Sequence, residues 1–179
     1  MKPFAFCPHC ATPLNEAFID GRDRMSCPRC GWIHYVNPLP VAIALTVNRN
    51  NELLVIRRAH EPGFNEWALP GGFLEAGERP EEGCLRELFE ETSLEGAIDR
   101  LLGVWHLESE LYGSLVAVAY RVIAAHERIS INHEVFEAGF YAPENLPPVR
   151  MDPLRQSPAG RHRLDGEPEQ RAARHPAGA

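Results

Sequence analysis

The sequence lacks long hydrophobic runs and has almost no lysine. No run of about eighteen apolar residues occurs in its 179 residues, which excludes a membrane-spanning helix. The N-terminal residues MKPFAFCPHC contain no hydrophobic signal core, so we expect a cytoplasmic protein with no membrane partner. Lys2 is the only lysine, and the net charge of −7 argues against nucleic acid bound through a broad basic surface.

The chain divides into three segments by composition. Four of the five cysteines lie in residues 1–36, and residues 37–148 alternate apolar runs with one patterned helix. Residues 149–179 contain four prolines, three glycines and no apolar periodicity. Such a segment cannot bury enough surface to offset its chain entropy, so we predict a disordered tail there.

The middle segment predicts a mixture of strands and one helix. Short β-rich runs with turn signals between them predict strands, at 41–47, 52–58, 101–111, 114–125 and 134–143. A helix is predicted from Pro80 to Thr92, because proline suits the first helical position and acidic residues suit the first turn. Strands on both sides of a central helix indicate an α+β domain with a mixed sheet.

The cysteines follow the spacing C-x2-C-x16-C-x2-C, through Cys7, Cys10, Cys27 and Cys30. Two such pairs brought together offer four thiolates at the corners of a tetrahedron, which is typical of a structural zinc ribbon. Two disulfides are the alternative, but a chain without an export signal disfavours them. A redox Cys-x-x-Cys pair is the other alternative, and two copies around sixteen residues fit a closed Zn²⁺ site better.

The predicted helix has two distinct faces. Its core-facing side is expected to carry Cys84, Leu85, Leu88 and Phe89, and Cys84 is read as a buried, inert thiol. Glu87, Glu90 and Glu91 share another face at spacings i, i+3 and i+4. Three carboxylates on one patch predict a binding site for a divalent cation such as Mg²⁺. The alternative is that these glutamates form an acidic helix face that is simply exposed to solvent.

The glycine-rich loop before the helix makes the pattern specific. With the helix it resembles the Nudix signature G-x5-E-x7-R-E-U-x-E-E-x-G-U, in which U is a bulky aliphatic residue. The matching residues are Gly72, Glu78, Arg86, Glu87, Leu88, Glu90, Glu91 and Leu94. Ser93 replaces the final glycine, and we predict local strain or a shifted helix end with activity retained.

The resemblance to the Nudix family implies a fold and a chemistry. The fold is an α/β/α sandwich, a mixed sheet with packed helices, preceded here by the zinc ribbon. The reaction is Mg²⁺- or Mn²⁺-dependent hydrolysis of a nucleoside diphosphate linked to another group. The implied Mg²⁺ site comprises Gly72, Glu78, Glu87, Glu90 and Glu91.

The same resemblance assigns further roles. The implied catalytic residues are Glu87, Glu90 and Glu91, with Arg86 orienting them and Glu137 as an additional carboxylate; Glu134 is the reserve. Arg57 or Arg58 is expected to meet a substrate phosphate, and a surface ion pair is the alternative. Trp105 is a candidate for base stacking, as are Phe64 and Tyr112, although core or loop packing is the more common role of such rings.

The order of the two segments, with the zinc ribbon before the Nudix segment, narrows the range of candidate substrates. NADH pyrophosphatases share this order but carry an SQPWPFPxS stretch, which is absent between Leu94 and Ala179. The sequence is more similar to ribbon-bearing enzymes acting on ADP-ribose or FAD. Alternatives are an NADH or NAD-capped RNA pyrophosphatase, and a nucleotide-sensing or nucleic-acid-binding regulator with an inactive Nudix domain. A homodimer is possible because many Nudix proteins dimerise.

Overall fold

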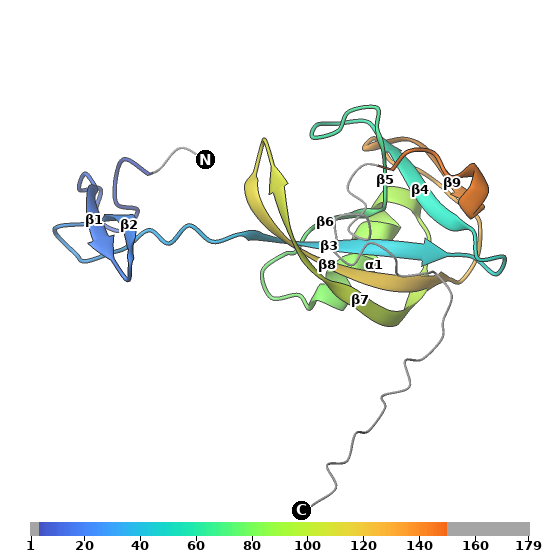
Figure 1. The fold of residues 1–179 in the computed structure, drawn as a ribbon, viewed down its shortest axis with the longest axis horizontal. Helices are drawn as coiled ribbons and strands as arrows, with labels where there is room; N and C mark the ends of the chain where they lie inside the picture. The colour runs from blue at the N-terminus through green and yellow to red at the C-terminus, as the bar shows by residue number, and fades with distance from the viewer. Residues whose placement is uncertain (1–3, 150–179) are drawn as a thin grey trace, which may run out of the picture.

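A computed structural model of the chain describes residues 4–149. Near the N-terminus, β1 (Asn15–Ile19) and β2 (Arg22–Ser26) form a two-stranded antiparallel sheet. An extended segment connects this small sheet to the larger sheet that holds the remaining strands (Figure 1). No helix within residues 4–149 has the length and hydropathy needed to cross a membrane.

The larger sheet has seven strands. These are β3 (Leu39–Val47), β4 (Leu53–Arg58), β5 (Trp67–Ala68), β6 (Gly71–Phe73), β7 (Gly96–Ser109), β8 (Gly113–Ala124) and β9 (Val135–Tyr141). The main order is β5-β4-β3-β8-β7, with β6 paired to β3 and β9 paired to β4. The β3–β8 pair is parallel and the other pairs are antiparallel, so the predicted mixed sheet is confirmed.

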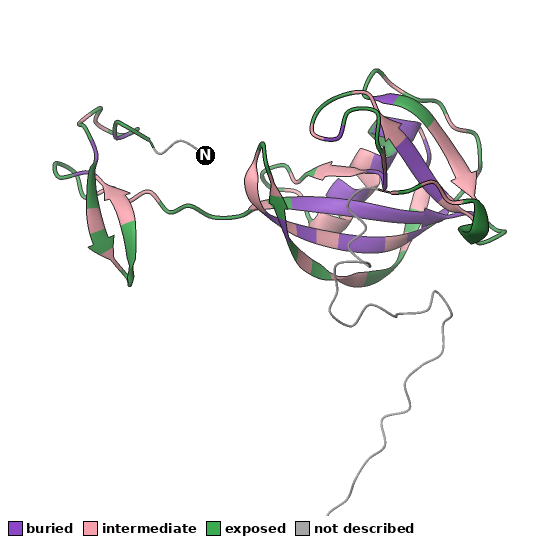
Figure 2. Ribbon diagram, turned by 45° about the horizontal axis from the view of Figure 1, so that its top comes forward, coloured by how far each residue is buried: buried purple, intermediate pink, exposed green. Residues whose placement is uncertain are grey.

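The helix α1 (Pro80–Thr92) packs on one face of this sheet. Alternate residues of β3 point to opposite faces, because side chains in a strand alternate. Ala42 and Ala44 pack with Leu88 on the α1 face, whereas Val41 and Ile43 belong to the cluster on the other face. Both faces of β3 are therefore buried, as the purple strand in Figure 2 shows.

The second face of the sheet carries no α-helix within residues 4–149. A short 3₁₀ turn, η1 (Pro143–Asn145), follows β9, and Leu146 and Val149 pack against the cluster on this face. The predicted α+β class is confirmed, but the second helical layer of the expected sandwich is not supplied by these residues. The predicted tail lies, apart from Val149, outside the described residues.

The helix begins and ends where the sequence predicts, but its buried face is rotated. Leu88 is fully buried as expected, whereas Phe89 is 51% exposed, so its placement in the core was wrong. Glu91 and Thr92 are buried instead. The rotation brings the carboxylate-bearing side of α1 against Gly71 and Gly72 of β6.

Candidate active site and zinc centre

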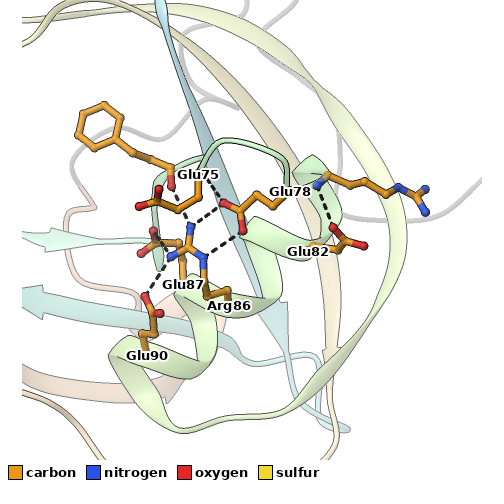
Figure 3. Close-up of polar contacts among 8 residues, drawn as sticks. Glu75, Glu78, Glu82, Arg86, Glu87 and Glu90 are labelled. Atoms are coloured by element: carbon orange, nitrogen blue, oxygen red, sulfur yellow. Dashed lines mark hydrogen bonds and ion pairs between the residues drawn. The ribbon is translucent and has the colours of Figure 1, made fainter.

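Arg86 lies at the centre of the acidic cluster between the glycine-rich loop and α1. Its Nε and Nη2 atoms donate to the two carboxylate oxygens of Glu78, at 3.1 and 2.7 Å. Its Nη1 donates to Glu87 Oε1 at 2.8 Å and to Glu90 Oε2 at 3.0 Å. A bond of 2.9 Å from Nη2 to the carbonyl of Phe73 completes the set (Figure 3). One guanidinium thus orients three of the predicted carboxylates.

The contact with Arg86 keeps the Glu78 carboxylate ionised. The hydrogen bonds from Arg86 lower the pKa of Glu78 to about 2, and the N–H of Glu75 adds to the effect. The same N–H donates to Glu78 Oε1 at 2.6 Å, which ties the carboxylate to its own loop. Glu78 therefore reaches back from the loop toward the helix, as the spacing predicts.

Glu91 is the most buried carboxylate of the cluster. Only 4% of it is exposed, and its Oε2 accepts the N–H of Gly71 at 3.0 Å. Burial, assisted by the charges of Glu87 and Glu134, raises the pKa of Glu91 to about 8 against the opposing effects of Gly71 and Arg58. Burial also raises the pKa of Glu87.

Gly72 is a glycine because Glu87 comes close to it. A Cβ atom at Gly72 would lie 2.5 Å from Glu87 Cδ and from its Oε2. The main chain of β6 thus forms one wall of the carboxylate cluster, and any side chain there would displace Glu87.

Gly83 also allows close packing around the carboxylates, and the sequence alone did not identify it. A Cβ atom there would clash with the Leu74 side chain and lie 2.8 Å from Glu78 Oε1. Glycine inside a helix costs about 1 kcal/mol relative to alanine, so its position within the predicted helix was a usable signal of close packing.

The two arginines at the end of β4 point in different directions. Arg58 lies near the cluster, since its charge lowers the pKa of Glu91. Arg57 shares the strand face of Val55, away from α1, and forms an ion pair of 3.1 Å with Glu137. Glu137 is thus paired across β4 and β9, whereas Glu134 is close enough to affect Glu87 and Glu91.

Trp105 is not brought together with these groups. It lies on β7 and packs against the core cluster on the face opposite α1. In the sheet order β7 is three strands away from β4, a separation of roughly 14 Å. The structure gives this ring a packing environment.

The chemistry of the acidic donor set fits a hard divalent cation. Oxygen ligands from several carboxylates suit Mg²⁺ or Mn²⁺. The oxygens turn toward Arg86 and Gly71 here. Among residues 4–149, the group whose ligand atoms all lie within 4.8 Å of one another is the cysteine group.

That cysteine group comprises Cys7, Cys10, Cys27 and Cys30. The Sγ–Sγ distances are 3.6 Å for Cys7–Cys30, 3.5 Å for Cys10–Cys27 and 3.7 Å for Cys10–Cys30. A tetrahedral site with Zn–S bonds of about 2.3 Å requires sulfurs about 3.8 Å apart. The four cysteines carry no disulfide and fit a closed zinc site.

Two family models match the chain. One, described as NUDIX domain, matches residues 37–161, and the other, described as Nudix N-terminal, matches residues 5–36. Together they cover both sheets of the structure.

Three of the relatives that match the chain are 30–32% identical to it. An ADP-ribose pyrophosphatase of Methanocaldococcus jannaschii is 32% identical over 119 residues, which are 66% of this chain and 70% of that protein. An NAD-capped RNA hydrolase NudC of Pseudomonas aeruginosa is 31% identical over 163 residues, or 89% of this chain and 54% of that one. A putative ADP-ribose pyrophosphatase, YjhB of Bacillus subtilis, is 30% identical, and the chain spans 59% of its length.

Solved structures share the fold. A NUDIX hydrolase from Nitrosomonas europaea superposes with a TM-score of 0.71 at 26% identity, covering 80% of this chain and 81% of that one. A UDP-X diphosphatase superposes with a TM-score of 0.55 at 29% identity, covering 65% and 56%.

Proposed function

The chain belongs to the Nudix family, and we propose that it hydrolyses the diphosphate bond of ADP-ribose or of a dinucleotide such as FAD or NADH. The observation that carries this proposal is the acidic cluster around Arg86, Gly71 and Gly72. It gathers at one place the carboxylates that the Nudix signature specifies.

In the proposed site Glu87, Glu90 and Glu91 hold the divalent cation, with Glu78 and the main chain at Gly72 beside them. When bound there, Mg²⁺ or Mn²⁺ would supply an activated water molecule and would offset the charge that develops on the diphosphate oxygens. Arg86 acts as a positioning residue, because it fixes the carboxylates of Glu78, Glu87 and Glu90 through four hydrogen bonds.

For the additional carboxylate on a late segment, Glu134 is supported better than Glu137. Glu134 acts electrostatically on Glu87 and Glu91, and its main-chain carbonyl accepts the N–H of Ala59 at 2.8 Å, which anchors its loop. Arg58, which lies near Glu91, is the better candidate for a substrate phosphate.

The substrate choice rests on the relatives and on one missing stretch. Two relatives matching two thirds of the chain are named for ADP-ribose, and the SQPWPFPxS stretch of NADH pyrophosphatases is absent. The second candidate is an NAD-capped RNA or NADH pyrophosphatase, since the NudC match extends over 89% of the chain. A Zn²⁺ ion bound by the four cysteines has a structural role in either case.

The direct test is turnover by the full-length, zinc-loaded protein. We expect AMP to be released from ADP-ribose, FAD or NADH when Mg²⁺ is present, and no release when Mg²⁺ is omitted. NAD-capped RNA is assayed beside them to separate the two candidates. If the folded protein hydrolyses none of these diphosphates, the proposal fails and a nucleotide-sensing role gains support.

Glu90→Gln tests the metal set. The Glu90 side chain is 51% exposed, so we expect the variant to fold normally. We expect its kcat to fall roughly a hundredfold or more, because a cation ligand is lost. Glu82→Gln is the matched control on the same helix, since Glu82 accepts only the N–H of Arg79 among the described hydrogen bonds. Near-normal turnover by Glu90→Gln would remove Glu90 from the set.

A further inference from the structure

Two exposed phenylalanines lie near the end of β4, outside the acidic cluster. Phe64 is in the loop between β4 and β5, and Phe136 is on β9. Their rings meet edge to face with centroids 5.5 Å apart, although Phe64 is 53% exposed and Phe136 is 47% exposed. Large apolar side chains left in contact with solvent and with each other offer a surface for a flat ligand.

Polar groups with fixed orientations surround this pair. Arg57 lies with its Cζ 5.7 Å from the centroid of the Phe136 ring. Its Nη2 contacts Glu137 Oε2 at 3.1 Å, and its Nη1 donates to Asn65 Oδ1 at 2.7 Å. The guanidinium therefore holds a half-exposed carboxylate and an exposed amide at the edge of the rings, and leaves the amide NH₂ of Asn65 available as a donor.

This group of residues is attached to the catalytic end of the sheet. Asn65 donates its main-chain N–H to the carbonyl of Arg58 at 2.8 Å, and Arg58 Nε donates to the carbonyl of Pro62 at 2.9 Å. Arg58 in turn acts on Glu91, and Glu134 precedes Phe136 by two residues. The rings and the carboxylate cluster thus sit at the same end of β4, on opposite faces of the sheet.

We propose that Arg57, Phe64, Asn65, Phe136 and Glu137 form a nucleobase site, which we name the Phe64–Phe136 site, and that it takes adenine. This inference rests on the proposed function and specifies how the substrate of that reaction is recognised. The base stacks on the exposed phenylalanine rings. Glu137 accepts a hydrogen bond from the exocyclic amino group, and the Asn65 amide donates to a ring nitrogen.

A second aromatic pair fits this role less well. Phe73 and Tyr112 also meet edge to face, with centroids 4.9 Å apart. Phe73 is only 36% exposed, and Tyr112 is half-buried against the core cluster on the same face. Tyr112 therefore packs against the core, whereas Phe64 and Phe136 are both exposed.

Binding of AMP tests the Phe64–Phe136 site without any hydrolysis, because AMP has no diphosphate bond. Isothermal titration of the full-length protein with AMP should give a Kd that rises about tenfold in Phe136→Ala, because the base loses a stacking partner. Phe18→Ala is the matched control, because Phe18 is 74% exposed on β1 and should leave the Kd unchanged. No AMP binding by the parent at millimolar concentration overturns the proposal.

Base preference tests Glu137 separately. A carboxylate accepts from the amino group of adenine and repels the carbonyl oxygen of hypoxanthine, whereas a glutamine amide can donate to that oxygen. We expect Glu137→Gln to lower the ratio of kcat/KM for ADP-ribose over IDP-ribose about tenfold or more. An unchanged ratio overturns the proposal, and so does an equal fall in kcat for both substrates, which would place Glu137 in the chemistry.

The two measurements separate this site from the proposed function. If no diphosphate is hydrolysed, the proposed function fails while the AMP titration still decides the site. If turnover by the parent is normal but Phe136→Ala leaves the Kd for AMP unchanged and Glu137→Gln leaves the preference for ADP-ribose over IDP-ribose unchanged, only the Phe64–Phe136 site is refuted. A change in sedimentation of Phe136→Ala without a change in Kd would show that the rings contact a second copy, and this also overturns the site.

Discussion

At the scale of single residues, the acidic stretch from Glu75 to Glu91 divides by environment. Glu78 is fixed by Arg86 and by its own loop, and Glu82 accepts the N–H of Arg79 at the helix start. Glu91 is buried with one main-chain donor. The pKa values of Glu78 and Glu91 thus differ, because Arg86 stabilises the charged form of Glu78 and burial disfavours the charged form of Glu91.

The pKa of Glu91 predicts how stability depends on pH when Mg²⁺ and Mn²⁺ are absent. In the folded state this pKa is about 8, against an ordinary value of 4.5. Between these values the folded state binds more protons than the unfolded state, so the free energy of unfolding falls as pH rises from 4.5 through 8. Glu91→Gln removes this group's contribution.

We therefore expect Glu91→Gln to be more stable than the parent at pH 8, by on the order of a few kcal/mol, and equal to it near pH 4.5. Urea unfolding at both pH values, without added divalent cation, measures the difference. A gain of the same size at both pH values would show that ionisation of Glu91 is not its cause.

Ser93 predicts a second residue-scale effect. It ends α1 in the left-handed conformation, with φ 56° and ψ 20°, and its N–H donates to the carbonyl of Phe89 at 2.7 Å. A residue with a Cβ is strained in this conformation, so we expect Ser93→Gly to raise the free energy of unfolding by about 1 kcal/mol with activity unchanged. Urea unfolding of the variant measures this, and a loss of stability would contradict it.

At the scale of elements, the site depends on how closely β6 approaches α1. β6 pairs with β3 through Gly71, Gly72 and Phe73, while Leu88 and Cys84 anchor the helix to the same face. The carbonyl of Phe73 and the N–H of Gly71 both bond to side chains of the helix. A three-residue strand thus helps to fix the positions of the carboxylates.

Gly72→Ala tests this arrangement. The new Cβ would lie 2.5 Å from Glu87 Cδ, so the carboxylate must move while the fold is retained. We expect kcat/KM to fall about tenfold or more, because small displacements of catalytic groups are costly. Gly77→Ala, in the loop between β6 and α1, is the control, since its Cβ would meet nothing within 4 Å; this variant should lose stability because of the φ of 94° at Gly77 and keep its activity. Equal activity of the two variants would contradict the prediction.

At the scale of the whole molecule, the chain contains two sheets of very different core size. The cluster around Cys7, Leu14 and Cys27 is small, with Cys10, Met25 and Trp32 packed against it. The larger sheet has apolar clusters on both of its faces. A core as small as that around Cys7 and Cys27 needs the free energy of metal binding in order to fold. The core of the seven-stranded sheet is large enough to fold without a metal.

Cys27→Ser is expected to lose Zn²⁺ and to unfold the region of β1 and β2 while the seven-stranded sheet persists. Zinc analysis together with amide chemical-shift dispersion measures both effects. Cys84→Ala is the control, because Cys84 is buried under α1, far from the zinc ligands in the chain, and its loss should leave the metal bound. Retained zinc in Cys27→Ser, or collapse of the whole chain, would contradict the prediction.

Much of the fold could be predicted because local patterns are strong in this chain. The helix from Pro80 to Thr92 has a proline at its start and a period that separates apolar from acidic faces. β5 and β6 were not predicted, because strands of two and three residues have no periodicity to detect. Phe89 was misplaced because the burial of Glu91 rotates the helix, and helix geometry alone does not predict that burial.

The sequence by itself determined the four cysteine positions, the carboxylate spacing and the Nudix signature, since these depend on intervals along the chain. Only the tertiary structure decided which carboxylates lie together. The pairing of β4 with β9 places Glu137 against Arg57 on one face of the sheet and leaves Glu134 near Glu91. The physical reason is that side chains alternate along a strand, so a shift of one residue in register moves a carboxylate to the opposite face.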